Sequence, residues 1–218
     1  MAKQQIEELR RRFQPAIDSL PSSKRARYEE LWILSRQPEH VSLDLPEGIY
    51  WPKETNATEW PQHLYQQDNG LFFTYLKSWE AAVIEALLGK EEVECWLRNL
   101  PRKPWSLAYW YEASDGTYKP GYPDLVVIRK TAYGRIADLY EPHGDHLSDG
   151  WHKAKGLARF ADNHAASYGR IAFARVRNNQ ATVLDFSLEN VRSRALRLNN
   201  DVDLDNLFHN QGIPIRQL

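Results

Sequence analysis

The sequence predicts an α/β domain with a mixed central sheet flanked by helices, together with a small helical appendage at the N-terminus. Two observations indicate this class. From about residue 72 onward, amphipathic helical segments alternate with short β-runs rich in Val, Ile and aromatic residues. The first 35 residues show helical periodicity and are separated from this region by a proline-containing stretch. With 218 residues, the chain is long enough for one sizeable hydrophobic core.

The N-terminal part is expected to contain two helices and an irregular connector. Residues 3–19 carry apolar side chains along one side of a helix, and Pro15 predicts a kink or break there. Two serines at 22 and 23 are suited to cap a second helix that runs through about residue 35.

The connector covers residues 38–70, which contain four prolines and few periodic apolar positions. Its aromatic residues need burial, so the segment is expected to be ordered. We therefore expect residues 1–65 to form a helical pair with a proline-rich connector, and residues 66–218 to form the main domain.

The main domain is expected to hold helices and strands in an order typical of a mixed sheet. The expected elements are a helix at 75–88, strands at 92–97, 106–112, 124–129 and 135–141, a helix at 149–166, strands at 170–176 and 181–187, and short helices near 189–197 and 202–209.

The stretch from 121 to 143 carries the most specific chemical signal. Two β-runs, at 125–128 and 136–140, are joined by a turn, with Asp124 before the first run and Glu141 after the second. If the runs pair as a hairpin, both carboxylates lie at the same end of the sheet. Hard divalent cations prefer such oxygen ligands, so the pattern indicates metal-dependent phosphodiester hydrolysis. Taken singly, either acid is equally explained as a residue that starts or ends a strand.

Several motifs together resemble the PD-(D/E)XK nuclease-like C-terminal domain of DEAD/DEAH-type helicases related to the type III restriction subunit. They cover about residues 65–175 and are Ser78-Trp79-Glu80, Trp96-Leu97-Arg98-Asn99, Pro104-Trp105-Ser106-Leu107, Tyr122-Pro123-Asp124, Glu141-Pro142-His143 and Lys153-Ala154-Lys155-Gly156-Leu157. This resemblance implies a restriction-endonuclease-like fold and a Mg²⁺- or Mn²⁺-dependent DNA endonuclease that works with a helicase in restriction or anti-phage defence. The family pattern has a lysine two residues after the second acid, where this chain has His143.

The resemblance also implies a third acid on the first core helix that completes the metal shell, with Glu80 as the first choice and Glu85 as the second. The alternative role of Glu80 is that of a first-turn acid favoured by the helix dipole. His143 has three interpretations: a metal ligand, a weak general base, or the mark of a decayed site. Lys153 and Lys155 offer a replacement for the missing ammonium, although their spacing on a helix lets at most one of them face the acids.

Charge is distributed unevenly along a chain whose formal net charge is −1. Residues 151–200 contain nine Lys and Arg against three acids, which indicates either a phosphate-binding surface or a solvated basic face. The candidate contacts to DNA are Arg98, Arg102, Lys103, Lys153, Lys155 and Arg159.

Other features limit the class of protein. Cys95 is the single cysteine, which excludes an internal disulfide and a multi-cysteine zinc site and fits a reducing cytoplasm. No apolar run has membrane-spanning length, so no membrane association is expected. No P-loop pattern is present, so a helicase motor would lie elsewhere. Two functions remain open: an active endonuclease, and a catalytically inactive nuclease-like module for DNA binding or subunit docking.

Overall fold

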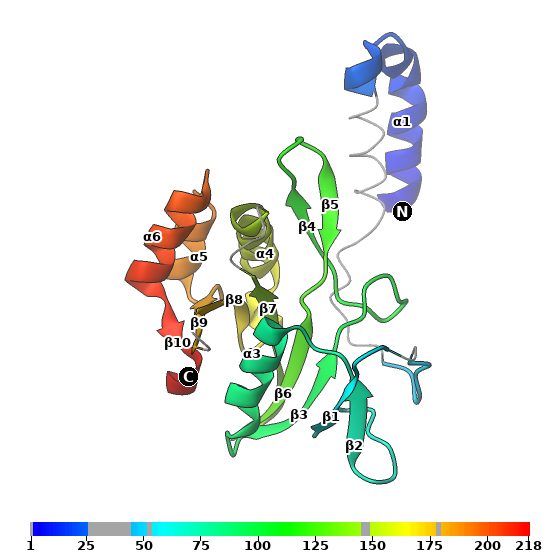
Figure 1. The fold of residues 1–218 in the computed structure, drawn as a ribbon. Coiled ribbons are helices and arrows are strands. Elements are labelled where there is room, and N and C mark those ends of the chain that lie inside the picture. Colours follow the sequence, from blue (N-terminus) through cyan, green and yellow to red (C-terminus); the bar gives the residue numbers. More distant parts are fainter. Residues whose placement is uncertain (1, 26–44, 52–53, 145–148, 178–179) are drawn as a thin grey trace.

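The computed structural model describes residues 2–25, 45–51, 54–144, 149–177 and 180–218. A six-stranded mixed sheet in the order β10-β9-β8-β7-β6-β3 forms its centre, with helices on both faces (Figure 1). The predicted α/β class is therefore confirmed. None of the helices in the described parts of the chain combines the length and apolar character that a membrane span requires.

The central strands are mostly antiparallel neighbours. Their bounds are β3 (Val93–Arg98), β6 (Leu125–Thr131), β7 (Gly134–His143), β8 (Ile171–Arg177), β9 (Gln180–Asp185) and β10 (Ile213–Pro214). The exception is the parallel pair β7–β8, which is joined through the helix α4 (Gly150–His164). Parallel neighbours need such a crossover, and it places the start of α4 beside the end of β7.

Helices cover the two faces of the sheet unequally. The helix α3 (Ser78–Leu88) packs on one face through Val83, Ile84 and Leu87. The other face is covered by α4, α5 (Glu189–Ala195) and α6 (Asp201–Gln211). Successive residues of β7 enter the two cores in turn, with Leu139 on the α4 side and Tyr140 on the α3 side. The short 3₁₀ turns η1 (Ala165–Ser167) and η2 (Ile215–Gln217) complete this part of the fold.

Two hairpins lie outside the central sheet. The predicted strand at 106–112 appears as β4 (Tyr109–Glu112), which pairs with β5 (Tyr118–Gly121) and packs against α4. Gly156 of α4 permits this packing, because a Cβ there would lie 2.5 Å from the Cβ of Tyr111. The other hairpin, β1 (Thr58–Pro61) with β2 (Leu71–Thr74), was not predicted from the sequence.

The N-terminal region agrees only in part with the expectation. The first helix is confirmed as α1 (Ala2–Asp18), and it continues through Pro15 without a break. Residues 22–25 are helical, whereas the rest of the second expected helix lies outside the described residues. The two sides of the expected boundary at residue 65 pair with each other in β1–β2, so that boundary falls inside a hairpin.

Candidate active site

The structure brings Asp124 and Glu141 to the same face of the sheet. The last ladder pair of β6 and β7 at this end is Leu125 with Tyr140, and the next step of the same register sets Asp124 opposite Glu141. Directly opposed residues of an antiparallel pair point to the same face. The hairpin inferred from the sequence is confirmed, and it places both acids where β7 leads into α4.

Asn99 fixes the backbone in front of Asp124. Its side-chain amide donates to the carbonyl oxygens of Leu107 and Pro123, each at 2.9 Å, and its backbone N–H donates to the carbonyl of Asp124 at 2.9 Å. Its amide oxygen accepts from the N–H of Leu107 at 3.0 Å. This buried asparagine therefore joins the loop after β3 to the start of β6 and sets the position of the first acid.

Burial and mutual repulsion act on both carboxylates. Burial, followed by the charges of Glu141 and Glu80, raises the pKa of Asp124 well above its usual value. Burial also raises the pKa of Glu141, although the ammonium of Lys153 opposes this effect. Ionised acids held together in this way favour a cation between them.

Lys153 supplies part of that positive charge. Its Nζ atom lies 3.0 Å from Glu141 Oε1 and 4.0 Å from Asp149 Oδ2. Burial alone would lower the pKa of Lys153, but the carboxylates of Glu141, Asp149 and Asp124 together raise it. Lys153 is therefore a protonated group at neutral pH, and α4 carries the ammonium that the sequence lacks at position 143.

Lys155 does not share this position. Its Nζ atom donates to the carbonyl oxygen of Leu198 at 2.8 Å and lies 5.8 Å from the centre of the Trp151 ring. We therefore withdraw Lys155 as a candidate catalytic residue, because the two-residue spacing turns its side chain away from the acids.

His143 is buried two residues beyond Glu141, on the same face of β7. Its Nε2 atom lies 3.4 Å from Asp149 Oδ1, and its ring packs against Gly150 at the start of α4. The histidine thus contacts the acid that also faces Lys153. From the position that the family lysine has in the sequence, it therefore supports the N-terminus of α4.

Glu80 has its own set of partners. It lies in the first turn of α3, where Glu80 Oε2 accepts from the N–H of Lys77 at 2.9 Å and lies 3.6 Å from Arg98 Nη2. Glu80 therefore has the position of a first-turn acid, which was the alternative to a metal ligand in the sequence. Its charge acts on Asp124 and Glu141, but its carboxylate is held on the α3 side.

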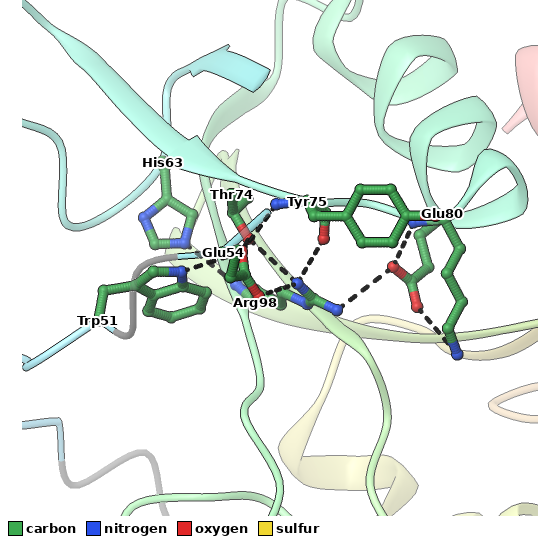
Figure 2. A network of polar contacts seen from close by, with 8 residues as sticks. Trp51, Glu54, His63, Thr74, Tyr75, Glu80 and Arg98 are labelled. Carbon is green, nitrogen blue, oxygen red and sulfur yellow. Dashed lines mark hydrogen bonds and ion pairs between the residues drawn. The ribbon is translucent and has the colours of Figure 1, made fainter. Parts of the chain in front are cut away.

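Arg98 occupies the centre of that polar network. Figure 2 shows its guanidinium between Glu54 and Glu80, with Thr74 and Tyr75 also in contact. It lies 3.1 Å from both Glu54 Oε1 and Thr74 Oγ1 and also donates to the carbonyl of Tyr75. Since these partners use the side chain, we withdraw Arg98 as a DNA contact.

The two acids fit a divalent cation with few protein ligands. Within the described ranges, no three His, Cys, Asp or Glu side chains form a group placed to hold one metal ion. Glu141 Oε2 is nevertheless buried without a hydrogen-bond partner, and the Asp124 carboxylate makes no hydrogen bond or ion pair to another described residue. Two carboxylates suit Mg²⁺, which keeps several waters and takes few protein ligands.

Most of the basic side chains in residues 151–200 are already paired within the fold. The pairs are Lys153 with Glu141, Arg170 with Asp138, Arg175 and Arg177 with Asp205, and Arg192 with Asp162. Nearby carboxylates partly neutralise these side chains, which favours the alternative of a basic face paired within the fold, while the phosphate-binding surface stays a prediction.

Three candidate DNA contacts remain available. Arg102 and Lys103 are exposed in the loop between β3 and β4. Arg159 lines a pocket of about 540 Å³ between α4 and the β4–β5 turn. None of the three side chains makes a hydrogen bond or ion pair to another residue in the part of the chain that the structure describes, so each is free to bind an anion.

Comparison with known proteins gives a family and a relative. A family model described as the YagJ family matches residues 61–214, a range that includes Glu80, Asp124, Glu141 and Lys153. Protein YagJ of Escherichia coli (strain K12) is 27% identical over 198 residues, which cover 86% of this chain and 80% of that protein. No solved structure matches. Neither name states an activity.

Proposed function

This chain belongs to the YagJ family, and we propose that it is a metal-dependent deoxyribonuclease with Asp124, Glu141 and Lys153 in its active site. The observation that carries the proposal is the ion pair between Lys153 and Glu141, at 3.0 Å, beside a second carboxylate. Two acids and one ammonium at a strand end are a set of groups suited to metal-dependent phosphodiester hydrolysis.

The acids have the role of cation ligands in this proposal. Asp124 and the unpartnered Glu141 Oε2 would hold Mg²⁺ or Mn²⁺. When bound, such an ion supplies a more acidic water and neutralises phosphate charge. Asn99 keeps Asp124 in place through the carbonyl oxygens of Pro123 and Asp124.

Lys153 has the role of a cation that stabilises negative charge in the transition state. Hydrolysis forms a bond from a water oxygen to phosphorus and breaks the bond from phosphorus to a sugar oxygen, so negative charge grows on the phosphoryl oxygens. Because the neighbouring carboxylates raise the pKa of Lys153, it remains charged and serves to stabilise that charge rather than to accept the proton of the water.

DNA is the proposed substrate, and three basic side chains support this choice. Arg102 and Lys103 are exposed, Arg159 is half-buried at a pocket, and all three are available to contact phosphates. Action beside a helicase in restriction or anti-phage defence is part of the proposal through the motif resemblance alone.

Cleavage of plasmid DNA tests the proposal. The wild-type protein is incubated with Mg²⁺ or Mn²⁺, with and without EDTA, beside the variant Asp124→Asn. We expect nicking or linearisation that depends on the metal and disappears in Asp124→Asn, while thermal unfolding shows that the variant is folded. Equal cleavage by wild type and variant would trace the activity to a contaminant and overturn the proposal.

A second function is favoured by one feature of the same ion pair. Lys153 already neutralises part of the charge on Glu141, so the fold holds this acid without any metal. This arrangement is also expected of a nuclease-like module that has lost catalysis and retains DNA binding or subunit docking. Calorimetric titration with Mn²⁺ separates the two: DNA binding with neither Mn²⁺ binding nor cleavage identifies the inactive module.

A further inference from the structure

Two buried polar atoms near the acids have no hydrogen-bond partner among the described residues: Tyr109 Oη and Glu141 Oε2. The first is a donor in need of an acceptor, and the second is an acceptor in need of a donor. A buried polar group without a partner costs free energy of folding, and a phenylalanine at position 109 would avoid that cost. The Tyr109 hydroxyl therefore indicates a hydrogen bond that forms in another state of the site.

A glycine on the neighbouring strand leaves space for the ring of Tyr109. Tyr109 is fully buried and stands opposite Gly121 in the β4–β5 ladder. A Cβ atom added at Gly121 would collide with the Tyr109 ring, so glycine admits the aromatic side chain here. Gly121 in turn precedes Asp124 by three residues, so one short segment supports the ring and carries the first acid.

Packing places Tyr109 and the acidic pair in the same layer of the fold. The strand β4, which carries Tyr109, packs against α4, and Glu141 is paired with Lys153 of the same helix. Burial and then the charges of Glu141 and Asp124 raise the pKa of the Tyr109 hydroxyl well above its usual value. The hydroxyl therefore keeps its proton under all ordinary conditions and is available as a donor.

We propose that Tyr109 is a positioning residue, whose hydroxyl donates a hydrogen bond to Glu141 Oε2 when the site is assembled with its cation and DNA. The inference rests on the proposed function. A carboxylate oxygen has more than one lone pair, so Glu141 Oε2 is able to accept from Tyr109 while it also faces a cation. Hydrogen bonds of this kind orient the carboxylates that bind metals.

The chain offers a conservative variant and a matched control. Tyr109→Phe keeps the ring against Gly121 and removes only the hydroxyl. Tyr168→Phe removes the hydroxyl of another buried tyrosine in the same hydrophobic core. Wild type and both variants are compared by thermal unfolding, by calorimetric titration with Mn²⁺ without DNA, and by steady-state cleavage of DNA.

We expect Tyr109→Phe to unfold at the same temperature as wild type or higher, because it loses a buried hydroxyl that has no partner. Its affinity for Mn²⁺ and its kcat should each fall about 10–100-fold, with KM for DNA unchanged. Tyr168→Phe should match wild type in Mn²⁺ affinity and in kcat. This combination distinguishes positioning from a purely structural role, which would lower stability and leave Mn²⁺ affinity unchanged.

The possible outcomes separate the two proposals. If wild type binds Mn²⁺ and cleaves DNA while Tyr109→Phe does both equally well, the role of Tyr109 is wrong and the nuclease proposal stands. If Tyr109→Phe only lowers the unfolding temperature, the hydroxyl is structural and the inference is again wrong. If wild type neither binds Mn²⁺ nor cleaves DNA, the nuclease proposal fails and the role of Tyr109 fails with it.

Discussion

Lys153 Nζ on α4 lies 3.0 Å from Glu141 Oε1 on β7. The two residues are 12 positions apart, and the segment that connects β7 to α4 lies between them. The ammonium therefore reaches the second acid from a helix instead of from the strand, where the family pattern places it. This relation explains how His143 can stand in the lysine position without removing the positive charge from the site.

Replacement of Lys153 should abolish most of the activity. Lys153→Met is expected to lower kcat by about 10²–10³-fold, because it removes the ammonium that stabilises negative charge on the phosphoryl oxygens. Lys155→Met is the control. It removes an ammonium from the same helix, but that ammonium donates to the carbonyl oxygen of Leu198. Single-turnover cleavage rates with saturating Mn²⁺ make the comparison. Similar losses in both variants would contradict the assignment of Lys153.

Metal-free stability should depend on pH through Asp124. Its pKa is raised in the folded protein, so its charge destabilises the fold as the pH rises above the unfolded value of about 3.9. Asp124→Asn should therefore be more stable than wild type at pH 7–8, and this gain should vanish below about pH 4, where Asp124 is protonated in both states. The charges that act on Asp124 are those of Glu141, Glu80, Lys153 and Lys77.

Thermal unfolding between pH 3.5 and 8 in EDTA measures this difference. Addition of Mn²⁺ at pH 7.5 should raise the unfolding temperature of wild type and leave that of Asp124→Asn nearly unchanged, since the bound ion stabilises only the form that binds it. A variant less stable than wild type at pH 8 would show that the Asp124 carboxylate contributes favourable interactions instead of repulsion.

Loss of the Asn99 side chain should weaken both stability and the site. Asn99→Ala leaves the buried carbonyl of Pro123 and the N–H of Leu107 without partners, which should cost about 1–3 kcal/mol. Mn²⁺ affinity should also fall, because Pro123 directly precedes Asp124, the first of the two proposed ligands. Asn210→Ala, on the exposed surface of α6, is the control. An Asn99→Ala protein with wild-type Mn²⁺ affinity would limit Asn99 to a structural role.

DNA affinity should depend on three basic side chains that have no partner among the described residues. Alanine at Arg102, Lys103 or Arg159 should weaken binding and reduce the slope of log affinity against log salt by roughly one unit for each phosphate that is no longer neutralised. Fluorescence anisotropy at several salt concentrations in Ca²⁺ or EDTA provides the slope. Arg177→Ala is the comparison, because Arg177 is paired with Asp205. An unchanged slope in all three variants would move the DNA-binding surface elsewhere.

The sequence contained enough information for the central hairpin and its acids. Alternation along β6 and β7, together with the turn between them, determines that Asp124 and Glu141 share a face. The return of an ammonium through α4 was also foreseeable, because a crossover from β7 begins beside Glu141. These relations depend on local periodicity, which a single sequence displays.

Relations between distant residues were not foreseeable. Arg98 meets Glu54, which lies 44 positions earlier, and Arg175 meets Asp205, which lies 30 positions later. Both arginines therefore looked free in the sequence but are neutralised in the fold. Tyr109 gave no signal beyond that of a strand residue, since its proposed role depends on the pairing with Gly121 and on the charges of distant acids.

The Arg98 network joins a residue before position 66 to the main domain. Arg98 contacts Glu54, Thr74 and Glu80. His63 stacks on Phe72 with ring centres 3.7 Å apart and also contacts Trp96. A proteolytic fragment that starts at residue 66 would lose Glu54 and His63 and expose the aromatic side of β3. The described part of the segment that was expected to be a connector therefore belongs to the packed domain. Protease-resistant fragments should begin upstream of Glu54.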